Sequence, residues 1–487
     1  MTSPRIAEVT RGLKQALPRE SVLVEREQLK PYECDGLSAY RETPLAAVIP
    51  GDDREVGEVL RVARSTGTPV VARGSGTGLS GGALPLADGI LVSLAKFNRI
   101  LAVDVLGRKA RVQPGVTNLR ISQQVAPHGL YYAPDPSSQI ACSIGGNVAE
   151  NSGGVHCLKY GLTVHNILRV RAITSEGDVL EIGSEALDGA GYDLLALMTG
   201  SEGLLAVILE VTVKLLPKPE TAQVVMASFA SIESAGEAVA SVIGAGIVPA
   251  GLEMMDKLAT AAVEDFVHAG YDLDAEAILL AESDGTREEV AHEVARMIEV
   301  MRASGATDIR CSGDEAERLR FWSGRKAAFP AVGRISPDYY CIDGSIPRSA
   351  LAKVLKRTGE MSAKYGLRCA NVFHAGDGNL HPLILYDANI PGEMERTEAF
   401  AAELLELCIE VGGTITGEHG VGVEKINQMC TQFRPAELAQ FRAVKEAFDP
   451  EGLLNPGKMV PTLHRCAEYG AMRVKGGALP HPELPRF

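Results

Sequence analysis

The sequence RGSGTGLSGG, residues 73–82, has glycine at five of its ten positions. Glycine is used where the backbone takes positive φ or closely approaches another group, and successive N–H groups in such a loop form a concave anion site. β-rich runs precede and follow the loop, at residues 68–72 and 89–94. The dinucleotide fingerprint needs a helix after its glycines, and a Walker A loop ends in GK[ST]. The segment therefore indicates either another kind of phosphate cradle or a glycine-rich hairpin.

Composition limits the class of protein. The chain has 487 residues, a net charge of −14 and nine cysteines, so two or three domains are expected and binding to nucleic acid is disfavoured. An odd number of cysteines without a CxxC pair argues against disulfides and against an iron–sulfur cluster in this chain, and favours the cytoplasm. Residues 2–18 lack the apolar core of a signal peptide, and no apolar run is long enough for a transmembrane helix.

The pattern of predicted strands and helices changes near Pro217-Lys218-Pro219, a sequence typical of a rigid linker. Before the linker, short strands and helices are predicted. From residue 221 to about 445, strands alternate with long helices rich in Ala, Glu and Arg, which predicts helices packed on one side of an antiparallel sheet. A turn-rich segment closes the chain. We therefore predict divisions at 1–220, 221–445 and 446–487.

A second glycine-rich stretch, PDPSSQIACSIGGNVAENSGG, spans residues 134–154. Its two Gly-Gly pairs would let a flat ring system approach the backbone, and Asn147 and Asn151 can hydrogen-bond the edge of such a ring. The alternative is a helix and a loop that cross in tight packing.

Histidines gather in the second half of the chain, in HAGDGNLH (374–381) and GEHG (417–420). Asp377-Gly378 predicts a hairpin turn that lets His374 and His381 converge. Imidazole and carboxylate groups are ligands for Zn²⁺, Mn²⁺ or Fe²⁺. We predict that His374, His381 and Glu418 bind a metal and that His419 is left as a base.

A base beside a Lewis acid is suited to removing the proton of a hydroxyl group. A hydride can then leave the carbinol carbon, and the glycine-rich first half could hold its acceptor. Cations for a substrate carboxylate are available at Arg325, Lys326 and Arg334. Arginine offers bidentate pairing, and Arg325, close to the single tryptophan, is our candidate for a second catalytic residue.

These motifs occur in one order over nearly the whole chain, together with residues 200–203 and LLNPGK (453–458). The ordered set resembles the vanillyl-alcohol-oxidase/PCMH flavoproteins, in their branch of D-2-hydroxy-acid dehydrogenases. The resemblance implies an α+β fold. It comprises a PCMH-type FAD-binding domain of two α/β subdomains with an N-terminal helix (1–220), an antiparallel-sheet-and-helix cap of the FAD-linked oxidase C-terminal type with the metal site (221–445), and a C-terminal segment that returns to the FAD domain (446–487).

The resemblance also implies the cofactor and its residues. Members with a histidyl-linked flavin carry a histidine in the first loop; none is present here, so FAD is expected to bind non-covalently. Related D-2-hydroxyglutarate dehydrogenases have metal ligands that match His374, His381 and Glu418, and a catalytic residue that matches His419. Their substrate lysine matches Cys341, which favours a short acid. The residues expected to contact FAD are Arg73, Gly74, Ser75, Gly76, Thr77, Gly78, Leu79, Ser80, Gly81, Pro134, Asp135, Ser138, Cys142, Ile144, Gly145, Gly146, Asn147, Asn151, Gly153, Gly154, Glu202, Gly203, Ile208 and Asn455.

Electrons need a separate acceptor, because the chain lacks a nicotinamide fingerprint and cluster cysteines. The resemblance implies a second FAD-binding subunit and an iron–sulfur subunit of a glycolate-oxidising complex that is peripheral to the inner face of the membrane and feeds quinone. The tail from Thr462 is the expected docking surface. Glycolate is the first expected substrate and D-lactate the second, with D-2-hydroxyglutarate also open. A metal-dependent phosphoester hydrolase and a non-catalytic flavin-binding scaffold are the alternatives from other classes.

Overall fold

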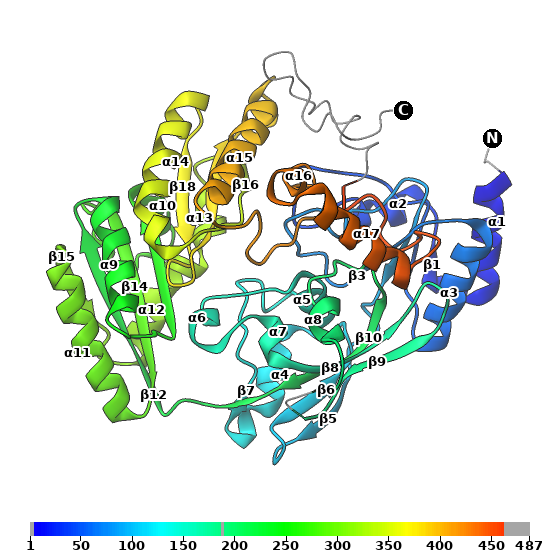
Figure 1. The fold of residues 1–487 in the computed structure, drawn as a ribbon, viewed down its shortest axis with the longest axis horizontal. Coiled ribbons are helices and arrows are strands. Elements are labelled where there is room, and N and C mark those ends of the chain that lie inside the picture. The colour runs from blue at the N-terminus through cyan, green and yellow to red at the C-terminus, as the bar shows by residue number, and fades with distance from the viewer. Residues whose placement is uncertain (1–3, 187–188, 462–487) are drawn as a thin grey trace.

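The computed structural model describes residues 4–186 and 189–461. Its ribbon has two lobes (Figure 1), one built from the first half of the chain and one that runs from β12 (Thr221–Phe229) to α15 (Glu393–Glu410). Sheets and helices occur in both lobes, which confirms the predicted α+β class. In the described part of the chain, no helix combines the length and the apolar character needed to cross a lipid bilayer.

The glycine loop of residues 74–89 joins two parallel neighbours in a four-stranded sheet of order β1–β2–β4–β3. In the pairing of β3 (Val70–Arg73) with β4 (Ile90–Ser93), Val70 lies opposite Ile90. Parallel strands need a crossover instead of a tight turn, so the hairpin alternative is wrong. The other elements before β4 are α1 (Pro4–Ala16), η1 (Arg19–Ser21), β1 (Val22–Leu23), α2 (Arg26–Leu29), η2 (Lys30–Tyr32), β2 (Ala46–Val48) and α3 (Asp53–Thr66).

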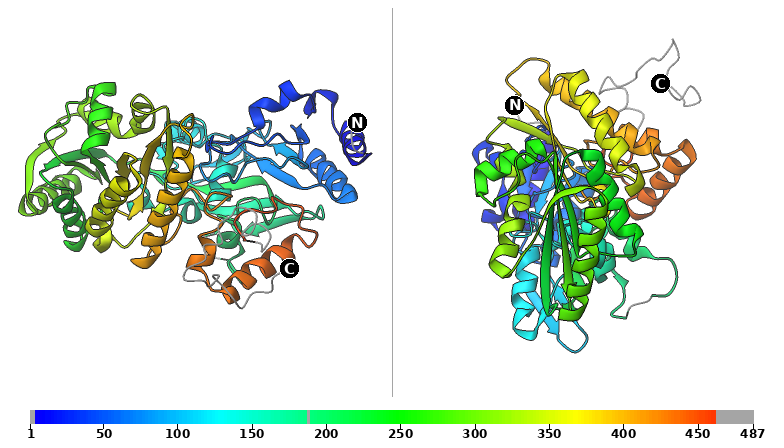
Figure 2. Two further views of the ribbon diagram at one scale, coloured as in Figure 1. Left: turned by 90° about the horizontal axis from the view of Figure 1, so that it is seen from above. Right: turned by 90° about the vertical axis from the view of Figure 1, so that its left-hand side faces the viewer.

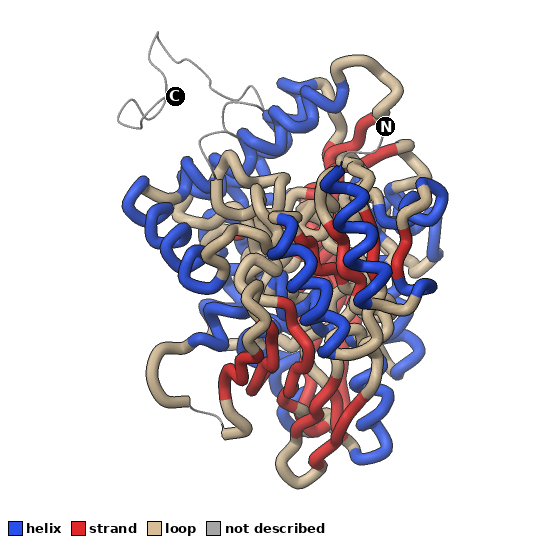
Figure 3. The backbone as a smooth tube through the Cα atoms, turned by 90° about the vertical axis from the view of Figure 1, so that its right-hand side faces the viewer, coloured by secondary structure: helices blue, strands red, loops and turns tan. Residues whose placement is uncertain are grey.

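Helix α3 is specified by both of its ends and by its apolar face. The Asp52 carboxylate accepts a hydrogen bond from the backbone N–H of Glu55 at 2.8 Å, and Gly67 ends the helix with φ of 57°. The buried face packs along α1, and these helices lie against the strands of the lobe (Figure 3).

A five-stranded antiparallel sheet of order β5–β6–β10–β8–β9 completes the first lobe. Its central strand β10 (Val207–Lys214) is buried along nearly its whole length. The remaining elements of this part are β5 (Ile100–Asp104), β6 (Lys109–Val112), α4 (Asn118–Val125), η3 (Ala126–His128), β7 (Leu130–Tyr131), α5 (Ile144–Glu150), α6 (Cys157–Tyr160), α7 (Thr163–Asn166), β8 (Ile167–Ile173), β9 (Val179–Gly183), α8 (Leu194–Met198) and β11 (Leu216–Pro217).

The second lobe, called the cap below, is built on a seven-stranded sheet of order β15–β12–β14–β13–β18–β20–β16. Its helices cover both faces (Figure 2), so the prediction of one covered face is wrong. On β12, Val225 packs into one core and Val224 into the other, because successive side chains point to opposite faces. The further elements are α9 (Ile232–Gly244), β13 (Gly251–Asp256), α10 (Lys257–Val267), β14 (Ala277–Gly285), α11 (Arg287–Ala303), β15 (Ala306–Cys311), α12 (Glu315–Lys326), α13 (Ala328–Val332), β16 (Asp338–Cys341), β17 (Gly344–Ser345), η4 (Arg348–Ala350), α14 (Leu351–Tyr365), β18 (Cys369–Phe373), β19 (Asn379–Leu380) and β20 (Pro382–Tyr386).

The C-terminal part of the described chain lies on the first lobe. After α16 (Met429–Gln432), α17 (Pro435–Phe448) places Lys445 so that its ammonium donates to the carbonyl of Leu204 at 2.7 Å. Leu454 then forms a parallel bridge with Val70. The three predicted divisions of the chain remain predictions, and the tail from Thr462 lies outside the described residues.

His156 joins the two lobes through a half-buried charge cluster. Its Nδ1 lies 2.8 Å from the Asp135 carboxylate and its Nε2 lies 3.2 Å from Glu282 of the cap. Burial lowers the pKa of His156, but these two carboxylates outweigh that effect and hold it well above its ordinary value. The charged imidazole therefore links the loop that carries Asp135 to strand β14 of the cap.

We expect His156→Gln to lower the melting temperature most at pH 6 and less at pH 9. The pKa of His156 is raised in the folded protein, so its contribution is fully present below the unfolded value of about 6.5 and is lost as the pH rises through the folded value. Thermal melts of both proteins at the two pH values measure this. An equal deficit at both would contradict a charged interlobe contact.

Candidate functional site

A cavity of about 400 Å³ lies between the lobes, and the glycine-rich stretches of the first lobe face the cap across it. The predicted site residues that line it are Arg73, Gly74, Ser75, Gly76, Thr77, Gly78, Leu79, Ser138, Cys142, Gly145, Gly146, Asn147, Glu202, Gly203, Ile208, His381, Glu418 and His419. Within the described ranges, the predicted residues outside that lining are Ser80, Gly81, Pro134, Asp135, Ile144, Asn151, Gly153, Gly154, Asn455, Arg325 and His374.

Glycines in this wall bring the backbone close to neighbouring groups. A Cβ at Gly74 would overlap the Ser143 hydroxyl, and a Cβ at Gly76, where φ is 69°, would overlap the Arg73 guanidinium. Ser143 in turn caps α5 by accepting from the N–H of Gly146 at 3.4 Å. Residues 74 and 76 therefore need glycine, because a larger side chain would collide with Ser143 or Arg73.

The residues present fit a bound flavin nucleotide. The cavity wall is largely glycine and other small residues, which suits the close approach of a phosphate group or a flat ring. Glu150 lines the same wall, and its buried Oε2 has no hydrogen-bond partner among the described residues. Buried polar atoms in proteins are normally paired, and this unpaired oxygen lies beside Gly420, next to the cavity residue His419.

The segment of residues 421–424 is hydrogen-bonded both to the glycine loop and to Glu202. The carbonyl of Ser80 accepts from the N–H of Val423 at 3.0 Å. The Glu202 carboxylate accepts from the N–H groups of Val421 and Gly422, at 2.6 and 2.7 Å. Segments that are far apart in the sequence therefore meet at the cavity.

His374, His381 and Glu418 converge at one point. The Oε1 atom of Glu418 lies 3.4 Å from Nε2 of His374 and 3.2 Å from Nε2 of His381. One possible ligand atom from each residue lies within 4.8 Å of the others. Oε2 of Glu418 is buried with no hydrogen-bond partner in the described part of the chain. Two imidazoles and a carboxylate with a free oxygen fit a divalent transition metal.

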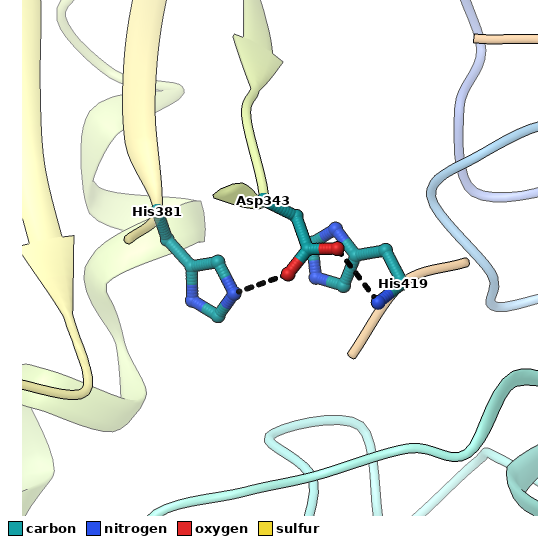
Figure 4. A group of neighbouring side chains, drawn as sticks. All are labelled: Asp343, His381 and His419. Carbon is teal, nitrogen blue, oxygen red and sulfur yellow. Dashed lines mark hydrogen bonds and ion pairs between the residues drawn. The ribbon is translucent and has the colours of Figure 1, made fainter. Parts of the chain in front are cut away.

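A second triad, Asp343, His381 and His419, is equally compact (Figure 4), but its carboxylate is already occupied. Asp343 accepts from the backbone N–H groups of residues 417, 418 and 419 at 2.9–3.1 Å. It also accepts from the buried ammonium of Lys425 at 2.9 Å. A carboxylate with this many donors is an anchor for the loop, so the first triad is the better fit for a metal ion.

The charges of the site follow from burial and from neighbouring groups. Burial raises the pKa of Glu418, but the adjacent histidines His374, His381 and His419 lower it to about 2. Burial is also the largest influence on His419, whose pKa falls to about 4 despite the nearby carboxylate of Asp343. At neutral pH the carboxylate of Glu418 is therefore ionised and the His419 imidazole is neutral.

Adjacent cations of the cap have different surroundings. Lys326, the last residue of α12, lines the cavity. Arg325 is buried, and its Nε donates to the Glu253 carboxylate at 2.7 Å. Consecutive helical residues point about 100° apart, so only one of two neighbours faces the cavity. Cys341 on β16 is buried and lines a different, smaller hollow of about 130 Å³.

Sequence reasoning missed three groups that support the site, namely Asp343, Lys425 and Glu253. They lie in three separate segments, and none is part of a motif with a chemical signature. The only local signal was a charged residue within an otherwise buried run, as in CIDGS (341–345) for Asp343. Charges in such positions are rarely buried unless they are paired.

Comparison with known proteins agrees with this architecture. Residues 44–183 match the family model described as "FAD binding domain", and residues 218–459 match "FAD linked oxidases, C-terminal domain". Glycolate oxidase subunit GlcD of Escherichia coli K12 is 62% identical over 98% of this chain and 96% of its own. D-lactate dehydrogenase of Anaerostipes hadrus is 31% identical over 93% of this chain and 97% of its own.

The fold is shared more widely than the sequence. A solved structure of p-cresol methylhydroxylase with substrate bound superposes with a TM-score of 0.81 at 19% identity, and covers 95% of this chain and 98% of its own. The two family models, the extensive identity and the shared fold confirm the family predicted from the motifs. The chain belongs to the PCMH-type family of FAD-linked oxidases, and it is an FAD-dependent oxidoreductase.

Proposed function

We propose that the protein oxidises short 2-hydroxy acids, with glycolate as the first candidate and D-lactate as the second. One observation carries the proposal: a single cavity is lined both by the glycine-rich wall that suits FAD and by Glu418 and His419. A group bound at the imidazoles would thus lie in the same space as the flavin. The names of the glycolate oxidase and D-lactate dehydrogenase relatives support this choice of substrates.

The mechanism assigns separate tasks to the residues of the site. His374, His381 and Glu418 would hold a divalent metal, and the wall of the first lobe would hold FAD non-covalently. When bound, the metal supplies Lewis acidity and FAD supplies the acceptor for a hydride. The neutral imidazole of His419 takes the proton of the substrate hydroxyl. Loss of this proton from the hydroxyl, together with loss of a hydride from the carbinol carbon, converts a 2-hydroxy acid into its 2-oxo acid. Glycolate thus gives glyoxylate.

Lys326 is our candidate for binding the substrate carboxylate. Of the described residues lining the cavity, Arg73 and Lys326 are those with a permanent positive charge. Arg73 lies beneath the glycine loop and donates to the carbonyl of Cys34 at 2.6 Å. Lys326 and His381 lie on the cap, and Glu418 and His419, from the loop that follows the cap, line the same space. We thus revise the assignment of Arg325, which the sequence favoured.

We expect Lys326→Met to reduce kcat/KM for glycolate about 10- to 100-fold, mainly through KM, because a hydrogen bond to a charged group contributes about 1.5–3 kcal/mol. Steady-state kinetics with an artificial electron acceptor measure this. Arg334→Met is the matched control, since Arg334 is exposed and pairs with Asp265 at 3.3 Å. An unchanged kcat/KM in Lys326→Met would contradict the assignment.

The electrons require a partner, and we propose a second FAD-binding subunit and an iron–sulfur subunit that pass them to quinone at the inner face of the membrane. The name of the E. coli relative, a glycolate oxidase subunit, supports an assembly. Deleting residues 462–487 should release the partners while FAD stays bound. Continued co-purification would rule out the tail as their docking surface.

Membership in the FAD-linked oxidases overturns the hydrolase alternative. The substrate is tested by anaerobic flavin reduction with glycolate, D-lactate and D-2-hydroxyglutarate. The proposal expects fastest bleaching with glycolate. Bleaching by D-2-hydroxyglutarate alone would contradict the short-acid proposal, and no bleaching by any 2-hydroxy acid would favour a scaffold.

A further inference from the structure

A buried charge pair lies directly behind the metal ligand His374. Glu253 is on β13 and Arg325 is on α12. The Arg325 Nε donates to Oε2 of Glu253 at 2.7 Å, and the other oxygen of Glu253 lies 2.7 Å from Nδ1 of His374. The side chains of Arg325 and Glu253 are only 2% and 1% exposed. The three groups thus form a line that ends at His374.

This line determines which nitrogen of His374 faces the site. Glu253 is held by a guanidinium on one side, so its ionised carboxylate accepts a hydrogen bond from Nδ1–H of the imidazole on the other. In the neutral imidazole that a metal requires, the lone pair is then on Nε2, which lies 3.4 Å from Glu418. In metalloproteins, a carboxylate bonded to the far nitrogen fixes the tautomer and ring orientation of a histidine ligand and raises its basicity.

Stability alone is a poor reason for burying such a pair. The desolvation of two charges commonly offsets their attraction, and apolar residues of similar size are often as stable or more so. The pair has a function beyond stability if it orients His374, to which Glu253 is hydrogen-bonded. We propose that Glu253 and Arg325 are positioning residues that orient His374 for metal binding; this inference rests on the metal site of the proposed function.

The test is the affinity of the FAD-loaded, full-length protein for Zn²⁺, measured by competition with a chromophoric chelator. E253Q removes the charge behind His374 and is expected to weaken Zn²⁺ binding about 10- to 100-fold. E282Q is the matched control. Glu282 lies opposite Gly251 on the neighbouring strand β14 and is bonded to Arg318 at 2.7 Å, so its loss disturbs another carboxylate–arginine pair of the cap, away from the metal ligands. E282Q is expected to lower the melting temperature but to keep the affinity of the wild type.

The double variant E253M/R325M controls for destabilisation by an unpaired buried charge, because it removes both charges of the pair. It is expected to retain FAD absorbance and to lose Zn²⁺ affinity as E253Q does. Unchanged affinity in the double variant, with H374A losing it, would overturn the positioning role and leave the proposed metal site intact. If the wild type and H374A bind Zn²⁺ equally weakly, both the inference and the metal site are overturned.

Discussion

Replacing His419 with glutamine is expected to slow the reduction of bound FAD by glycolate about 100- to 10,000-fold, the range of general-base catalysis. The imidazole lines the cavity and stacks on His381 at 4.9 Å between ring centres. Glutamine occupies similar space and can hydrogen-bond the hydroxyl, but it cannot take the proton. Anaerobic stopped-flow absorbance measures the rate constant directly.

The binding of FAD should be unchanged in this variant, because the glycine-rich wall comes from the first lobe. His292→Gln is a suitable control, since His292 lies exposed on α11 in the cap. A yellow His419→Gln protein that is reduced at the wild-type rate would show that another group accepts the proton.

The second large effect is expected from Asp343→Asn, which should abolish most activity and lower the free energy of unfolding by about 3–5 kcal/mol. The carboxylate holds three successive N–H groups of the loop that carries Glu418 and His419. Its loss also leaves the ammonium of Lys425 buried without its closest counter-charge, and breaking a buried pair costs this amount. Denaturant titration and anaerobic flavin reduction measure the two effects.

The double variant Asp343→Asn/Lys425→Met separates these causes. It removes the unpaired charge and should recover most of the stability, but the loop still lacks its anionic anchor and the rate should stay low. Recovery of the rate together with the stability would mean that Asp343 serves only to balance Lys425. Full activity in the single variant would contradict the anchoring role altogether.

The sequence was informative where the chemistry needs a local pattern. The glycine-rich stretch 73–82 and the turn between His374 and His381 are each contiguous. Residue type and spacing alone therefore indicate a cradle or a hairpin at the first and a pair of converging imidazoles at the second. The order of the motifs then identified the family. The helical coverage of the cap sheet was not readable in the same way, because strands buried on both faces lose the alternation that distinguishes one face from the other.

The supporting groups of the site could not be predicted because they depend on contacts across the fold. Asp343 and Lys425 are 82 positions apart, and Glu253 and Arg325 are 72 apart. The choice between Arg325 and Lys326 turned on the direction in which each points at the end of α12. A preference for arginine as a carboxylate partner is sound chemistry, and here the structure provides that carboxylate within the protein, at Glu253.

The cooperation of the flavin cavity with the imidazole cluster is tested most directly by adding glycolate anaerobically to the FAD-loaded protein before and after chelation of divalent metal. Rapid bleaching of the oxidised flavin is expected before chelation. It should be lost on chelation and restored by Zn²⁺, Mn²⁺ or Fe²⁺. Bleaching that is equally fast in the chelated protein and in His374→Ala would contradict a role for the cluster.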